Sequence, residues 1–214
     1  MLICKEYGFA FIHIPRTGGN SVRETLAQQL AVPVIRKSAA QGLQKRVSDL
    51  VSPAAKAWLA GKVQGTPLRY YITTAGHPSA ALLRLTVKDF RSLRTFSFVR
   101  NPYERVVSGY KNATGSGEFT ADFGSYTEKC LRYIQPQVNF VSLNGKIIVD
   151  FVGRVERVQE DFDHICKWVG LEQYTLPVLS ASPPGDYRDF LTPVTKQRIK
   201  ALFEEDFSAF QYSM

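Results

Sequence analysis

The chain has 214 residues, of which 44% are hydrophobic and 21% are charged, a composition typical of a folded globular protein that argues against wholesale disorder. Its 27 Lys and Arg residues against 19 Asp and Glu give a net charge of +8, which favours anionic partners without selecting among them. No run approaches the roughly 18 apolar residues that span a bilayer, and the three cysteines lie too far apart to indicate a disulfide framework or a cysteine zinc cage.

The first predicted element is a strand at residues 9–14, which is apolar on both faces except at His13. Such a pattern is typical of a central parallel strand that is covered on each side. A helix is expected at residues 22–30, directly after a Pro-Arg-Thr-Gly-Gly-Asn-Ser turn. The free N–H groups and the dipole of a helix N-terminus favour an anion, so this junction predicts a phosphate site.

The turn carries several groups suited to gripping a phosphate. These are the forked cation of Arg16, the side-chain donors of Thr17, Asn20 and Ser21, and the close backbone approach allowed by Gly18 and Gly19. The turn is not a Walker A motif, because Asn20 stands where a lysine is required and the leading glycine is absent. This departure weakens an ATPase or kinase interpretation.

Residues 34–69 are expected to be helical or irregular, and they carry seven Lys or Arg residues against one Asp. That bias suits a surface for an acidic substrate, with a solvated helical face as the alternative. A second strand is predicted at residues 70–74. His77 follows it between Gly76 and Pro78, at the strand end where open parallel sheets place their chemistry, and spacing alone leaves a functional and a structural role equally open.

A third strand is predicted at residues 95–99, followed by a helix at residues 103–110 with Pro102 near its first turn. Arg100 lies at the strand end, and Ser108 lies about two turns along the helix. They are not neighbours on one helix face. They could still converge on a single ligand that lies across the junction between strand and helix.

The later elements complete an alternating pattern. They are a loop at 112–124, a helix at 128–133, a strand at 146–151, an amphipathic helix at 157–169, a surface loop at 176–189 and a final helix from Thr192 that packs through Ile199, Leu202 and Phe203. Asp150 has the position of a metal-binding aspartate, although a strand-terminal structural role is the alternative. Strands that alternate with helices predict an α/β fold, a single domain over residues 1–214 with a central, mainly parallel sheet flanked by helices and a P-loop-like nucleotide site.

Three segments together carry a family resemblance, namely HIPRTGGNS, FVRNPYERVVSGY and DFVGRVERVQEDF. In combination they resemble the sulfotransferases that use 3'-phosphoadenosine 5'-phosphosulfate, in the branch that includes the carbohydrate O-sulfotransferases. The likeness extends from residue 9 to about residue 210.

The resemblance implies a role for each candidate residue. Arg16 to Ser21 would surround the 5'-phosphosulfate, Arg100 and Ser108 would bind the 3'-phosphate, and His77 would act as general base on the acceptor hydroxyl. Gln137 would contact the substrate, with a turn residue beside Pro136 as the alternative. The family usually carries Lys where this chain has Arg16, and a guanidinium can stabilise a leaving phosphate but does not give up its proton.

The resulting hypothesis is sulfuryl transfer to a hydroxyl, with a carbohydrate as the expected acceptor, an acidic one included, and adenosine 3',5'-bisphosphate as the by-product. No metal, nucleic acid partner or membrane span is expected, and the cysteine usage favours a cytoplasmic location. Two alternatives stay open: a P-loop kinase with an atypical loop, and a non-catalytic module that binds a nucleotide or RNA.

Overall fold

The computed structural model describes residues 1–30, 77–177 and 186–214. The basic region at 34–69 and the strand expected at 70–74 lie outside the described residues, as does most of the loop expected at 176–189.

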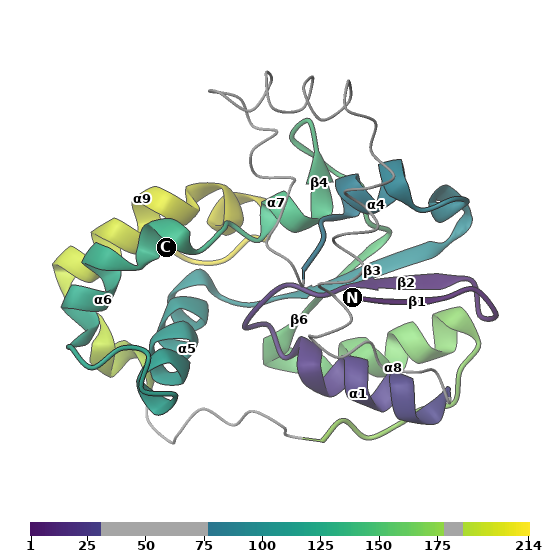
Figure 1. Cartoon of the computed structure of the whole chain (residues 1–214), viewed down its shortest axis with the longest axis horizontal. Coiled ribbons are helices and arrows are strands. Elements are labelled where there is room, and N and C mark those ends of the chain that lie inside the picture. The colour runs from purple at the N-terminus through teal and green to yellow at the C-terminus, as the bar shows by residue number, and fades with distance from the viewer. Residues whose placement is uncertain (31–76, 178–185) are drawn as a thin grey trace.

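A four-stranded sheet lies at the centre of the described chain (Figure 1). Its order is β1 (Leu2–Cys4), β2 (Phe9–Ile12), β3 (Arg94–Val99) and β6 (Phe151–Arg154). The pairs β2–β3 and β3–β6 are parallel, and only the short β1 is antiparallel to its neighbour. The fold is therefore mixed α/β with a mainly parallel central sheet flanked by helices, as the sequence predicts.

One face of the sheet is covered by α1 (Gly19–Gln29) and α8 (Val158–Val169), which both lie below the sheet in Figure 1 and share one apolar core with it. Phe9 and Phe11 point into this layer, because alternate residues of a strand face opposite sides. The helix α8 has the predicted amphipathic pattern: Phe162, Ile165 and Val169 are buried against the sheet.

The other face is covered by α4 (Ala80–Thr86), α7 (Val138–Val141) and a small hairpin of β4 (Ser142–Leu143) and β5 (Lys146–Ile147). Ala10 and Ile12 of β2 face this layer. All four residues of β2 are fully buried, which confirms the predicted central strand.

A third layer gathers beyond one end of the sheet, where β3 leads into it (Figure 1). It consists of α5 (Pro102–Gly115), α6 (Phe123–Lys129) and α9 (Pro193–Ala209), which share an apolar core that includes Ile199 and Phe203. Each helix begins at a side-chain cap: Asn101, Asp122 and Thr192. Short 3₁₀ turns lie at Phe90–Ser92, Leu131–Tyr133, Val155–Arg157 and Tyr187–Phe190.

Four expectations need correction. The strand expected at 146–151 is divided, because Lys146–Ile147 turns back onto β4 and only Phe151 onward joins the parallel sheet. Part of the loop expected at 112–124 is helical, since α5 continues to Gly115. The helix expected at 128–133 ends at Lys129 and is followed by a 3₁₀ turn. Leu202, expected in the core, is 38% exposed.

Asp150 lies beside the beginning of β3, whereas Arg100 follows the last residue of that strand. One of its carboxylate oxygens accepts hydrogen bonds of 2.7 Å from both the backbone N–H and the hydroxyl of Thr95, near the beginning of β3. The backbone N–H of Asp150 also donates to the Thr95 carbonyl at 2.9 Å. These contacts join β3 to the segment that enters β6. They favour a structural role for Asp150 over metal binding.

Candidate active site

The turn after β2 has an unusual backbone. Arg16 has a φ of 69° and Gly18 a φ of 66°, both in the left-handed region, which is costly for a residue with a Cβ. Gly18 is the residue that precedes α1, and as a glycine it provides no side-chain cap for the helix. Strain at a non-glycine residue is often found at functional sites.

Thr17 stabilises the turn from within. Its side chain is almost fully buried, and its hydroxyl donates a hydrogen bond of 2.9 Å to the carbonyl of Ile14. Asn20 lies on the exposed side of the first turn of α1. The predicted donors of the turn therefore divide, because Thr17 faces the protein and Asn20 faces solvent.

His13 and His77 lie against one another beside this turn, with ring centroids 4.6 Å apart. The His13 ring is buried, and its Nδ1 has no hydrogen-bond partner among the described residues. Burial, together with the smaller effect of the neighbouring His77, lowers the pKa of His13 to about 2. The His13 ring also fills the space next to Gly19, where an added Cβ would lie 2.5 Å from His13 Nε2.

The orientation of the His77 ring follows from one contact. Its Nδ1 lies 3.0 Å from the backbone carbonyl of His13. A carbonyl oxygen only accepts, so Nδ1 carries the proton in this hydrogen bond. In the neutral ring the lone pair is then on Nε2, which gives His77 the tautomer that a proton acceptor at Nε2 needs.

Arg100 and Ser108 line one cavity of about 370 Å³. Arg100 directly follows β3, and Ser108 lies on the following helix α5, so the structure brings these two predicted residues together. The complete lining is Arg100, Glu104, Val107, Ser108, Lys111, Asp186, Tyr187 and Arg188. Arg100 Nε is bonded to Glu104 Oε2 at 3.2 Å, so its two Nη groups are the remaining donors of that guanidinium.

The Arg16 guanidinium has a lowered pKa. Desolvation is the largest cause; the positive charge of Arg100 also lowers this pKa, whereas Tyr126 and Glu118 raise it.

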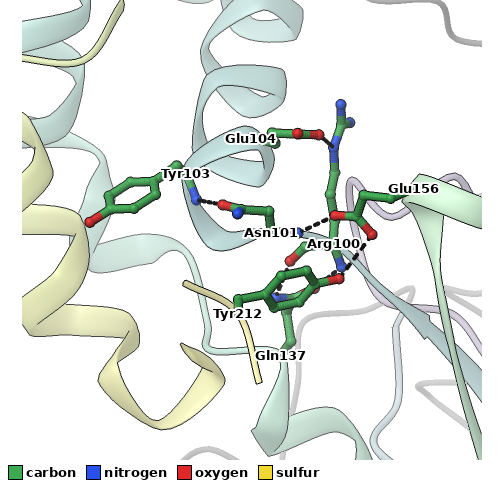
Figure 2. Close-up of polar contacts among 7 residues, drawn as sticks. All are labelled: Arg100, Asn101, Tyr103, Glu104, Gln137, Glu156 and Tyr212. Carbon is green, nitrogen blue, oxygen red and sulfur yellow. Dashed lines mark hydrogen bonds and ion pairs between the residues drawn. The ribbon is translucent and has the colours of Figure 1, made fainter. Parts of the chain in front are cut away.

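Gln137 is placed differently from a substrate contact. Its side chain is fully buried, and its amide is bonded to both the N–H and the carbonyl of Arg100 (Figure 2). This geometry favours a structural role for Gln137. Its bonds to Arg100 go beyond those expected of a turn residue beside Pro136, the alternative that the sequence suggests.

Two of the cations that line the cavity, Lys111 and Arg188, were missed by sequence reasoning. Lys111 could have been found, because Glu104, Ser108 and Lys111 are spaced four and three residues apart on one face of α5. Arg188 comes from a distant part of the chain, and no local pattern places it beside Ser108.

Within 1–30, 77–177 and 186–214, no group of three or more His, Cys, Asp or Glu side chains could hold a metal ion. No helix in the same ranges combines the length and the apolar character needed to cross a membrane.

Comparison with known proteins gives one match over nearly the whole chain: the model of the sulfotransferase family matches residues 1–213. An uncharacterized protein from Archaeoglobus fulgidus is 29% identical over 114 residues, which is 50% of this chain and 93% of that protein. A crystal structure of a sulfotransferase from Alicyclobacillus acidocaldarius aligns with a TM-score of 0.35 and 19% identity, over 62% of each chain. The aligned part thus spans less than two thirds of that solved protein.

Proposed function

The chain belongs to the sulfotransferase family, and we propose that it moves a sulfuryl group from 3'-phosphoadenosine 5'-phosphosulfate to the hydroxyl of a carbohydrate acceptor. The observation that carries the proposal is that Arg100 and Ser108, from two different elements, line one cavity. A second cation, Arg16, lies at the turn before α1.

A donor with phosphate groups at both its 5' and 3' positions fits such a pair. The 3'-phosphate would be bound by the Nη groups of Arg100 and the hydroxyl of Ser108, through charge-assisted hydrogen bonds. Lys111 and Arg188 add positive charge to the same cavity, while Glu104 and Asp186 limit its net charge. The 3'-phosphate is the group that separates this donor from ATP and ADP, so the cavity would determine which nucleotide binds.

The 5'-phosphosulfate would lie at the turn from Arg16 to Ser21. The first-turn N–H groups of α1 and the Arg16 guanidinium would stabilise the negative charge that the phosphate keeps when the sulfur–oxygen bond breaks. Arg16 acts through its fixed charge alone, because a guanidinium does not lose its proton in proteins.

His77 is the proposed general base. Its Nε2 would take the proton of the acceptor hydroxyl as the hydroxyl oxygen forms its bond to sulfur. The hydrogen bond from Nδ1 to the His13 carbonyl supports this role, because it holds the ring and directs the lone pair to Nε2. No step of this scheme requires a metal ion, since cations and backbone amides neutralise the developing charge.

The acceptor is proposed from charge. The region at 34–69, with seven Lys or Arg residues against one Asp, would attract an acidic saccharide. If the acceptor were a neutral sugar, the excess of basic residues at 34–69 would have no role in binding it.

Nucleotide affinity tests the donor assignment. Titration calorimetry in EDTA is expected to show that adenosine 3',5'-bisphosphate binds about 10- to 100-fold more tightly than adenosine 5'-monophosphate, the range for charge-assisted hydrogen bonds. Arg100→Ala should remove most of this preference. Arg91→Ala, which removes an exposed charge outside the cavity lining, is the matched control and should keep it.

Two results would count against the donor. One is equal weakening of both ligands by Arg100→Ala. The other is tight binding of ATP that depends on Mg²⁺ and ignores a 3'-phosphate, which would favour the kinase alternative.

A further inference from the structure

The main chain of Arg100 is held on both sides by a single side chain. Gln137 Oε1 accepts a hydrogen bond of 2.8 Å from the Arg100 N–H, and Gln137 Nε2 donates one of 2.8 Å to the Arg100 carbonyl (Figure 2). Gln137 is fully buried, so water does not compete for these bonds. Both polar groups of the Arg100 main chain are thus fixed by one amide.

The direction of that amide is itself determined. Asp206, on α9, is fully buried and accepts hydrogen bonds from the backbone N–H groups of Gln137 and Val138, each at 2.8 Å. Gln137 Nε2 also lies 3.3 Å from the Asp206 carboxylate. Three N–H groups directed at one carboxylate leave Gln137 Oε1 to face Arg100, so the amide has one orientation that satisfies every partner.

The residue after Arg100 is held as well. The Asn101 N–H donates to Glu156 Oε1 at 2.8 Å, and the Tyr212 hydroxyl donates to Glu156 Oε2 at 3.0 Å (Figure 2). The junction between β3 and α5 therefore has its backbone fixed from two directions before any ligand binds.

The same segment is tied to the turn that carries Arg16. Arg105 is buried, and it donates from Nε to the Pro15 carbonyl at 3.1 Å and from Nη1 to the Gln135 carbonyl at 2.8 Å. Pro15 immediately precedes Arg16, and Gln135 lies two residues before Gln137. Buried Arg105 thus bonds to the main chain directly before Arg16 and to the main chain two residues before Gln137.

We propose that Gln137 is a positioning residue for nucleotide recognition: it fixes the Arg100 main chain, and with Arg105 it sets the spacing between Arg100 and the Arg16 turn. The inference rests on the proposed function, because it takes Arg100 to be the reader of the 3'-phosphate. Gln137 itself touches no ligand in this assignment, since it is enclosed by Arg100 and Asp206.

The test is the ratio of two affinities, that for adenosine 3',5'-bisphosphate over that for adenosine 5'-monophosphate. Gln137→Met keeps the length of the side chain and removes its hydrogen bonds, and it should lower this ratio about tenfold. Gln137→Asn is a second variant, which keeps a polar amide but shortens the side chain by one methylene. It should also lower the ratio.

The chain contains a closely matched control. Gln159, on α8, accepts from the backbone N–H of Leu176 at 2.8 Å and donates to the carbonyl of Tyr174 at 3.0 Å and to Asp163 at 2.7 Å. It makes the same three kinds of contact outside the cavity lining. Gln159→Met should lower thermal stability as Gln137→Met does, and it should leave the affinity ratio unchanged.

A double-mutant cycle separates positioning from general destabilisation. In an Arg100→Ala background, Gln137→Met should cause no further loss of the ratio, because Gln137 acts through Arg100. A ratio that Gln137→Met leaves at the wild-type value, or that Gln159→Met lowers equally, would overturn the inference. A wild-type protein without any preference for the 3'-phosphate would instead overturn the proposed function.

Discussion

His77 has a position that only the folded chain reveals. Its Nδ1 is bonded to the carbonyl of His13, 64 residues earlier in the chain. The sequence placed His77 after a strand and left its role open, because the tautomer of a histidine depends on which partner the fold brings to it. The neighbouring His13 provides this partner through its backbone carbonyl.

His77→Ala is expected to lower the rate of sulfuryl transfer by about 10²- to 10⁴-fold, the usual contribution of a positioned base. Nucleotide affinity should stay at the wild-type value, because the base acts on the acceptor. Single-turnover kinetics with calorimetric binding measures both. His164→Ala, which changes an exposed histidine on α8, is the control, and wild-type turnover by His77→Ala would remove this residue from the mechanism.

His13 should make the protein less stable in mild acid. Burial lowers its pKa from 6.5 to about 2, so below pH 6.5 the unfolded chain binds a proton that the folded chain does not. The free energy of unfolding should therefore fall as the pH is lowered from 6.5, by up to about 1.4 kcal/mol per pH unit from this residue.

Urea unfolding of wild type and His13→Leu between pH 7 and pH 5 checks this slope. The variant starts from a lower stability but should lose less of it per pH unit. If the free energy of unfolding falls equally per pH unit in both proteins, His13 is not the cause of the acid destabilisation.

At the scale of elements, β2, the following turn and α1 form one unit that depends on Gly19. The His13 ring occupies the place of a Cβ at position 19, so the helix approaches the strand closely there. The sequence identified the two glycines as aids to phosphate binding. The packing role of Gly19 could not be predicted, because it depends on the rotamer of a histidine six residues earlier.

Gly19→Ala should destabilise the protein by about 1–3 kcal/mol, the cost of overpacking a filled site. Gly115→Ala is the control, because an added Cβ at Gly115 meets no atom within 4 Å and alanine favours the end of α5. Thermal unfolding measures both. In a His13→Ala background the cost of Gly19→Ala should fall, and an unchanged cost there would contradict the overlap with His13.

The strands show how much of the sheet can be predicted from the pattern of apolar residues. The residues of β2 and β3 were predicted almost to their bounds, because β2 is an apolar run and β3 is rich in aromatic and β-branched residues, and both are buried almost throughout. The parallel strand β6 was wrongly placed, since the apolar run at 146–151 ends where Phe151–Arg154 begins. β1, with three residues, is too short to give a periodic signal.

At the scale of the molecule, the site lies where the central sheet meets the third helical layer. Arg100 directly follows β3, Ser108 lies on α5, and Asp206 on α9 holds Gln137. The α/β fold and the two cationic segments could be predicted, because their signals are local in sequence. The contacts of Gln137, Arg105 and Arg188 could not be predicted, since their partners lie 30 or more residues away or on a different element.

The central claim is sulfuryl transfer from 3'-phosphoadenosine 5'-phosphosulfate, and the most direct test follows the sulfuryl group itself. The full chain is incubated in EDTA with sulfate-labelled donor and with fractions of acidic glycans, neutral glycans and small alcohols. Labelled acceptor and adenosine 3',5'-bisphosphate are measured in the same samples. The proposed function predicts that both products form in equal amounts, most from acidic glycans, and that His77→Ala loses both. Failure to form the bisphosphate with every fraction, while Mg²⁺ and ATP give a phosphorylated acceptor, would contradict it.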